Sequence, residues 1–159
     1  MPKTIQKQLS NEQAWYKRRC PTRYNRIVDT VKALRHMFED FPEAACIDSS
    51  LVLLDHIPNL TIMNGWYKKG KTKVRHTWVY DLVYRCHIDV TFGQFNPDID
   101  LKFLVVRAKH TNVLTGMGYS LFTLPQWSEL GQVNTDIRKR KSIFASKDTL
   151  DQMYKKARK

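Results

Sequence analysis

Three residues of this chain have the types and the order that nucleophilic catalysis requires. Cys46 opens an apolar run, His76 begins the segment His-Thr-Trp-Val-Tyr, and Asp89 lies in the segment Ile-Asp-Val-Thr. A thiol nucleophile needs a base to remove its proton, and the base needs a carboxylate that fixes its tautomer and stabilises its charged form. The sequence therefore predicts a cysteine hydrolase or acyl transferase with a Cys46–His76–Asp89 triad.

Cys46 is expected at the start of a helix. The apolar residues over about 45–56 have helical spacing, with Ile47, Leu51 and Leu54 on one face and Pro58 just beyond the end. Unpaired backbone N–H groups and the positive end of the helix dipole favour a thiolate in the first turn, and the same N–H groups could receive a developing oxyanion. The alternative that Cys46 is only a core residue stays open, because free cysteine is among the most buried residue types.

A β-hairpin is expected to bring His76 and Asp89 together. If residues 76–81 and 84–89 pair through a loop at residues 82–83, His76 lies directly opposite Asp89. Leu-Val is poor turn chemistry for a two-residue loop, so a longer loop would shift this pairing. A one-residue slip would place the two groups on opposite faces. Because side chains alternate along a strand, the hairpin predicts one shared face for His76, Trp78, His87, Asp89 and Thr91.

The remaining pattern indicates an α+β protein with N-terminal helices, a mostly antiparallel sheet and a C-terminal helix. Apolar residues over 24–37 have helical spacing, whereas residues 1–20 are polar, and we expect them to be loosely ordered at the start, with a short helix from Ser10. Asn64-Gly65 is a turn signal, and residues 146–154 are typical of a C-terminal helix. We expect a single domain over 1–159, since no linker divides the chain. Strands are predicted near residues 60–63, 77–80, 88–92, 101–106 and 119–124.

The net charge of +12 is unevenly distributed, with Lys and Arg concentrated in residues 1–36, 68–75 and 137–159. A basic field of this size attracts acidic partners, of which nucleic acid is the commonest. The partner is therefore predicted to be an acidic protein substrate or a nucleic-acid-associated complex; plain solubility is the other interpretation. We expect no membrane interaction and a cytoplasmic location, since no secretion signal or membrane span is evident, and the three irregularly spaced cysteines fit a reducing compartment.

The segment from about 44 to 95 resembles the papain-like and transglutaminase-like cysteine hydrolases. The shared pattern is a cysteine heading a helix, then His76-Thr-Trp-Val, then Ile88-Asp89-Val-Thr-Phe-Gly-Gln94-Phe. The resemblance implies Cys46 as nucleophile, His76 as general base and then acid, and Asp89 as the orienting carboxylate. It also implies a fold in which the cysteine-bearing helix packs against an antiparallel sheet. The chain departs from the pattern at Thr77, where alanine is usual, and no glutamine a few residues before Cys46 supplies an oxyanion donor.

Three residues near the predicted triad have supporting roles. Trp78 is expected to pack over the site and to exclude water from the His–Asp pair. His87 is a rival base, a substrate contact or a satisfied, partly buried histidine, and Gln94 is a substitute oxyanion donor or a structural residue. No cofactor is expected, and no metal site, since the cysteines and histidines lack the close ligand pairs of structural zinc sites.

The leading hypothesis is thus an enzyme that acts on an amide or thioester bond through an acyl-enzyme. Proteolysis, glutamine deamidation and acyl transfer stay open, and a host-modifying effector of phage or bacterial origin, acting in the host cytoplasm, suits the size and charge. The alternative is a non-catalytic nucleic-acid or ribonucleoprotein-binding protein with a degenerate papain-like fold.

Overall fold

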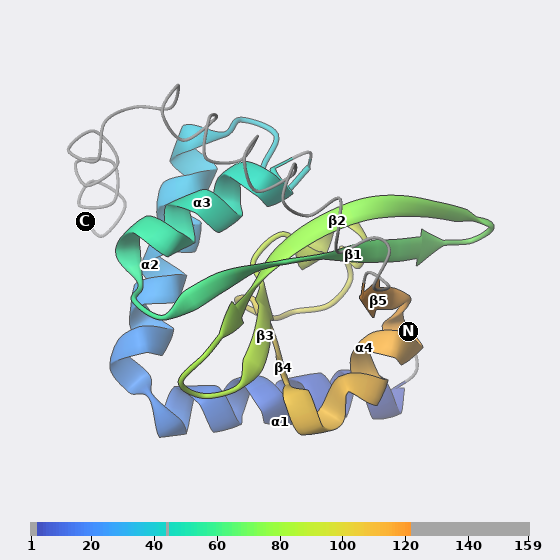
Figure 1. Ribbon diagram of the computed structural model, residues 1–159, viewed down its shortest axis with the longest axis horizontal. Coiled ribbons are helices and arrows are strands. Elements are labelled where there is room, and N and C mark those ends of the chain that lie inside the picture. Colours follow the sequence, from blue (N-terminus) through green and yellow to red (C-terminus); the bar gives the residue numbers. More distant parts are fainter. Residues whose placement is uncertain (1–2, 44, 122–159) are drawn as a thin grey trace.

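The computed structural model describes residues 3–43 and 45–121. Within them, four α-helices and two short 3-10 helices surround a curled antiparallel sheet of five strands (Figure 1). The three longest helices precede all the strands. The predicted α+β class with N-terminal helices is therefore confirmed.

Helix α1, Lys3–Arg19, replaces the loosely ordered segment that was expected at the N-terminus. Its Leu9 and Tyr16 are completely buried, and the helix packs along strand β4. The prediction was wrong because its few inward-facing residues are separated by long polar stretches, so that the helix depends on tertiary packing rather than on a strong apolar stripe. Helix α2, Pro21–Met37, follows almost without a break; its N-terminal proline already has a helical φ and needs no partner for an N–H.

Helix α3, Cys46–His56, begins and ends close to where the apolar spacing predicts. Ile57 caps it in an extended conformation, and the chain then enters the first strand. The helix lies across strands β1 and β2 (Figure 1). The predicted packing of the cysteine-bearing helix on the sheet is thus found.

The sheet has the order β4-β3-β2-β1-β5, and each neighbouring pair is antiparallel. Strands β1 and β2 form a long hairpin, whereas the other strands are short. β3 is followed by a 3-10 helix, Phe92–Gln94, and β4 by a second one, Ala108–His110, and by helix α4, Thr111–Met117. The strand bounds are Leu60–Lys69 (β1), Thr72–Asp81 (β2), Cys86–Asp89 (β3), Leu104–Arg107 (β4) and Tyr119–Leu121 (β5).

The turn predicted at Asn64-Gly65 is wrong, because β1 passes straight through these residues. The chain turns at Gly70 instead, which has a φ of 63°. Gly65 is required for another reason. A Cβ atom there would lie 2.1 Å from the carbonyl oxygen of Ser120 and 2.8 Å from the ring of Trp78, so only glycine allows β5 to approach β1.

Each face of the sheet carries its own apolar core. One core joins α2 and α3 to the sheet through residues such as Leu34, Leu53, Val79 and Ile88. The other core joins α1 and α4 to the opposite face, through Leu9, Trp78, Leu104, Val113 and Tyr119. Strand β2, which carries His76, is therefore packed on both of its faces.

The predicted C-terminal helix over 146–154 and the basic segment 137–159 lie outside the described residues. Of the helices that the structure does describe, none combines the length and apolar character needed to cross a bilayer.

Candidate functional site

Strands β2 and β3 pair with a register that differs by two residues from the expected one. Val79 lies opposite Ile88 and Asp81 opposite Cys86, so the loop has four residues, 82–85, instead of two. The side chain of Asp81 makes this longer loop stable, because its Oδ1 accepts hydrogen bonds from the backbone N–H groups of Val83 and Tyr84. The predicted direct opposition of His76 and Asp89 is therefore wrong.

The shift leaves the predicted shared face intact, since a displacement of two residues returns every side chain to its original side. His76 lies beyond the last β2–β3 pair and reaches Asp89 diagonally. Its Nε2 atom is 2.7 Å from Oδ2 of Asp89. Both side chains are almost completely buried, at 1% and 3% exposure.

The protonation states of His76 and Asp89 are set by their mutual attraction, which outweighs the effect of burial on each pKa. Burial by itself disfavours the charged form of His76, but the carboxylate of Asp89 and the side chain of Cys46 outweigh it and raise the pKa of His76 to about 9. Burial likewise opposes the charge on Asp89, yet His76 and the hydrogen bonds that the carboxylate accepts hold the pKa of Asp89 below its usual range. Near neutral pH the pair is an imidazolium and a carboxylate.

Cys46 is the first residue of α3, and its side chain is among the groups that raise the pKa of His76. Because Asp89 binds Nε2, Nδ1 is the ring nitrogen left for the thiol. Nδ1 is buried and makes no hydrogen bond of ordinary geometry within the described residues. The thiol–imidazole contact is thus looser than a formed hydrogen bond, as is common in catalytic sites without substrate.

The other two cysteines are unsuited to the same chemistry. Cys20 is buried beside Tyr16, and burial raises the pKa of its thiol to about 11. Cys86 is completely buried, and burial together with the charge of Asp81 raises its pKa well above the ordinary range. Cys46 is the only one of the three that is partly exposed.

Asp89 is held by four donors from three residues, His76, Thr91 and Tyr119. Its Oδ1 accepts from the backbone N–H and the hydroxyl of Thr91, at 2.9 and 3.0 Å. Its Oδ2 accepts from Tyr119 at 2.7 Å in addition to His76. Gln94 extends the network, since its Nε2 donates to the hydroxyl of Thr91 at 3.1 Å. This bond engages the side-chain amide of Gln94 in the support of Asp89.

Trp78 and His87 form a second pair beside the first. The ring of Trp78 stacks on that of His76 at 5.6 Å between centroids and is 2% exposed, so it covers one face of the imidazole. Its Nε1–H donates to Nδ1 of His87 at 3.0 Å. Burial lowers the pKa of His87 to about 4, which makes this histidine a neutral acceptor and a poor base near neutral pH.

Tyr119 is a side chain of the candidate site that sequence reasoning missed. Burial, and then the charge of Asp89, raise the pKa of its phenol well above the ordinary value, so it stays a hydrogen-bond donor. Tyr119 lies on β5, which pairs with β1 at the far side of the hairpin from β3. Tyr119 reaches Asp89 only because the sheet curls, and no local sequence pattern predicts that contact.

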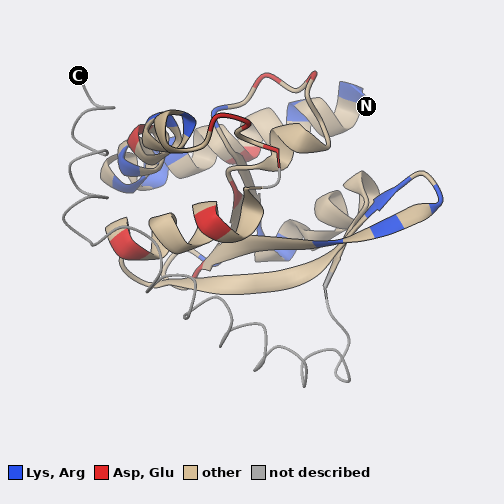
Figure 2. Cartoon of the chain, turned by 90° about the horizontal axis from the view of Figure 1, so that it is seen from above, with Lys and Arg blue, Asp and Glu red and all other residues tan. Residues whose placement is uncertain are grey.

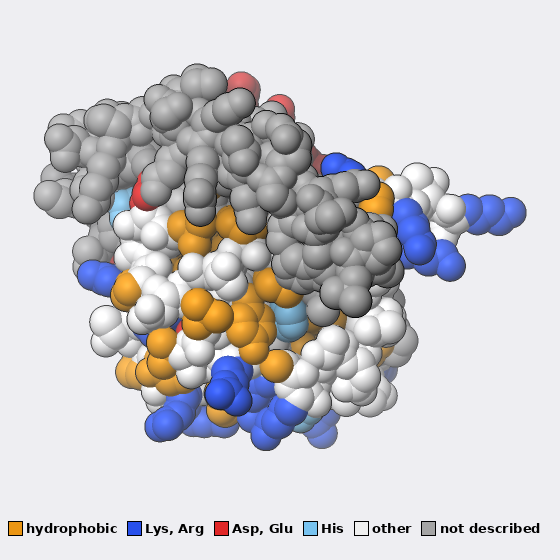
Figure 3. Space-filling view, in the orientation of Figure 1, with side chains coloured by type: hydrophobic (Ala, Val, Ile, Leu, Met, Phe, Trp, Pro, Cys, Tyr) orange, Lys and Arg blue, Asp and Glu red, His pale blue; other side chains and the backbone are white. Residues whose placement is uncertain are grey.

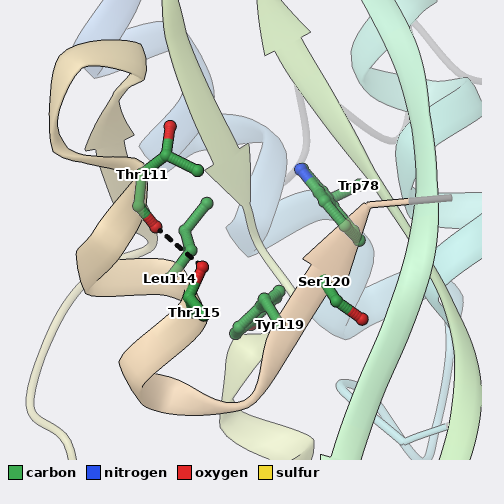
Figure 4. Close-up of a pocket in the computed structure, with 6 residues that line it drawn as sticks. All are labelled: Trp78, Thr111, Leu114, Thr115, Tyr119 and Ser120. Atoms are coloured by element: carbon green, nitrogen blue, oxygen red, sulfur yellow. Dashed lines mark hydrogen bonds between the residues drawn. The ribbon is translucent and has the colours of Figure 1, made fainter. Parts of the chain in front are cut away.

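An apolar cavity of about 190 Å³ lies between α4 and β5 (Figure 4). Trp78 and Tyr119 form part of its wall, and the remaining lining comes from Thr111, Leu114, Thr115 and Ser120. None of these side chains is a nucleophile with an adjacent base. The cavity shares two residues with the packing around His76 but supplies no chemistry of its own.

Among the described residues, no group of three or more His, Cys, Asp or Glu side chains is arranged to hold a metal ion. Comparison with known proteins finds no family model, no curated protein and no solved structure that matches this chain. The chemistry of the site is therefore argued from its geometry.

Proposed function

We propose that this protein is a cysteine-dependent hydrolase or acyl transferase that acts on an amide or thioester bond. Cys46 is the nucleophile, His76 the general base and then acid, and Asp89 the orienting carboxylate. The observation that carries this proposal is a buried imidazole whose Nε2 lies 2.7 Å from Oδ2 of Asp89. The side chain of Cys46 is among the groups that raise the pKa of the same ring. The resemblance to papain-like and transglutaminase-like enzymes points to the same roles.

The protonation of the pair suits this reaction. With the pKa of His76 near 9, the ring is an imidazolium near neutral pH, and its positive charge favours the nucleophilic, deprotonated form of a neighbouring thiol. Attack of Sγ on the carbonyl carbon forms a tetrahedral oxyanion. The His76 imidazolium then gives its proton to the leaving amine or thiol as the carbon–heteroatom bond breaks. Water or an amine, deprotonated by His76, resolves the resulting thioester.

Two kinds of donor on the α3 side of the sheet are candidates for the oxyanion. The first is the set of backbone N–H groups in the first turn of α3, which no side chain caps. The second is the amide of Asn64, which is 3% exposed on the face of the sheet that α3 covers. Its Oδ1 accepts from Thr77 at 2.9 Å, and its buried Nδ2 has no partner within the described residues. An unpaired buried donor is costly unless a ligand uses it.

The rate of iodoacetamide alkylation at each cysteine, resolved by mass spectrometry against pH, tests the proposal. Cys46 should react fast below pH 7, and His76→Ala should slow it, while Cys20 and Cys86 stay slow in the folded protein. His36→Ala, which removes an exposed histidine of α2, is the matched control and should change nothing. Slow reaction of Cys46, or indifference to His76→Ala, would contradict the proposed pair.

A second experiment separates a reactive thiol from an acyl-enzyme. An activated acyl ester should leave an acyl group on Cys46 that neutral hydroxylamine removes, and Cys46→Ala should abolish the adduct. Labelling of Cys20 or Cys86 instead would assign the reactivity elsewhere.

A non-catalytic nucleic-acid-binding protein is the second candidate function. It is favoured by the net charge of +12, which a thiol hydrolase does not need. In that case Cys46 alkylates like an ordinary exposed thiol, and tight nucleic-acid binding is lost steeply as salt rises.

A further inference from the structure

The far half of the β1–β2 hairpin extends beyond the rest of the sheet. β3 pairs with β2 only over residues 79–81, and β5 pairs with β1 only over residues 65–67. Within the described part of the chain, residues 69–73 therefore pair only with β1–β2 partners, and Lys68 also donates its backbone N–H to the carbonyl of Gly118 at 2.9 Å. Figure 1 shows this part projecting from the molecule, and we name residues 66–75 the basic ribbon.

The basic ribbon carries five cations and no acidic residue. All five are exposed, and they colour the tip of the hairpin in Figure 2 and the projection at the edge of the space-filling view in Figure 3. They are Lys68, Lys69, Lys71, Lys73 and Arg75.

The cations are placed where they repel one another. Lys68 lies directly opposite Lys73 in the ladder, on the same side of the ribbon. Like charges in directly opposed positions destabilise a β-hairpin. Arg75, on that same side, lies over the ring of Trp66 at 5.7 Å. The fold gains nothing from this repulsion, whereas a polyanion bound to the ribbon would relieve it.

We propose that the basic ribbon is a docking surface for double-stranded DNA. A two-stranded antiparallel ribbon is one of the elements that the major groove admits, since the groove is about 12 Å wide and about 8.5 Å deep. Four of the five cations are lysines, which bind phosphates as point charges and so favour backbone contact over base readout. The dense, regular array of phosphates on a duplex suits closely spaced cations without any acidic residue among them better than the scattered carboxylates of an acidic protein do.

The ribbon also directs the duplex toward the candidate site. Arg75 is followed directly by His76, and Gly65, next to the start of the ribbon, lies opposite His76 in the ladder. The side that carries Lys68, Lys73 and Arg75 is the one on which α3 packs, because Leu60 and Val79, on the same side of their strands, share a core with Leu53 of α3. DNA on this side would lie beside the end of α3 that bears Cys46.

A variant with four of the ribbon lysines neutralised tests the proposal: Lys68→Gln, Lys69→Gln, Lys71→Gln and Lys73→Gln together. The matched control removes four exposed charges from α1 and α2: Lys3→Gln, Lys7→Gln, Arg18→Gln and Lys32→Gln. Binding to a fluorescent 20-base-pair DNA duplex is measured by anisotropy over a range of salt concentrations. Each phosphate contact contributes about 0.9 to the slope of log K against log salt, so the ribbon variant should lose about 3 to 4 from that slope and the control less than about 1.

Three outcomes would overturn the proposal. Equal losses in both variants would show a general cationic field without a docking surface. An unchanged slope in the ribbon variant would place the contacts elsewhere. Tighter binding of a duplex RNA or of polyglutamate than of the DNA duplex would assign the ribbon to another partner.

The test does not depend on the proposed enzyme. Cys46→Ala should bind the duplex like the wild type, and the ribbon variant should keep the wild-type alkylation rate of Cys46 and a melting temperature no lower than that of the wild type. DNA binding thus tests the basic ribbon, and the alkylation rate of Cys46 tests the catalytic pair, so that the failure of one proposal is distinguished from the failure of the other.

Discussion

Replacing Asp89 with asparagine should collapse the raised pKa of His76. In the wild type, burial disfavours the imidazolium, and the charge and hydrogen bond of Asp89 lead the groups that overcome it. Asp89→Asn keeps the shape of the side chain but removes its charge. Burial is then opposed only by Cys46, and the pKa of His76 should fall from about 9 to 6.5 or lower.

The size of the effect follows from the same values. The pKa of His76 is about 9, against 6.5 for an ordinary histidine, and at about 1.4 kcal/mol per pKa unit the difference corresponds to about 3 kcal/mol. Because the pKa is raised in the folded state, this stabilisation is complete below pH 6.5 and is lost as the pH rises through about 9. The stability advantage of the wild type over Asp89→Asn should therefore shrink by about 3 kcal/mol across that interval.

Two measurements check this. An NMR titration of the histidine rings gives the pKa directly, with the His76 signal assigned by its absence in His76→Gln among the five histidines of the chain. Urea unfolding at several pH values gives the stability difference, and Asp98→Asn, at an exposed carboxylate, is the control that should leave both quantities unchanged. A wild-type His76 that titrates at 6.5 or below would refute the reasoning, and so would a difference between wild type and variant that does not vary with pH.

Three further substitutions probe the supports of the site. Tyr119→Phe removes one of the donors to Asp89, so the pKa of Asp89 should rise in a carboxyl NMR titration and the unfolding free energy should fall by about 2 kcal/mol. Gly65→Ala forces β5 away from β1, and calorimetry should show a loss of about 2 kcal/mol or more together with slower Cys46 alkylation. Asp81→Asn leaves Arg23 without its buried partner and should cost about 3 kcal/mol in urea unfolding, yet leave the alkylation rate of Cys46 unchanged.

Local sequence patterns were sufficient for the parts of the site that depend on one element. The start of α3 near Cys46 follows from helical spacing, its end follows from Pro58, and the shared face of His76, Trp78 and Asp89 follows from strand alternation. The register itself was wrong by two residues. The alternation nevertheless held, because the loop gained residues in a number that preserves the side of every side chain.

The contacts that depend on tertiary packing were not predictable. Tyr119 reaches Asp89 only because the sheet curls, and Gly65 was read as a turn when its actual role is to let β5 approach. Likewise α1 has a polar sequence, and its place on β4 is secured by Leu9, Tyr16 and the buried Glu12, which binds Arg107 of that strand at 2.7 Å. These interactions join residues far apart in the chain, so no window of sequence contains both partners.

The two buried aspartates of the sheet show which feature distinguishes a chemical site from a structural one. Each carboxylate accepts hydrogen bonds from two backbone or hydroxyl donors on Oδ1 and from two side chains on Oδ2. For Asp81 the side-chain partners are Tyr16 and an arginine, Arg23, whose charge does not change near neutral pH. For Asp89 they are a tyrosine and His76.

Burial and hydrogen-bond saturation are therefore common to both and say nothing about catalysis. The difference is the partner's ability to exchange a proton. Arg23 can only hold Asp81 in place, whereas His76 has a second nitrogen, Nδ1, that makes no hydrogen bond of ordinary geometry within the described residues and is the one left for Cys46. A saturated carboxylate becomes part of an acid–base system only through such a titratable neighbour, and at this site that neighbour stands next to a partly exposed thiol.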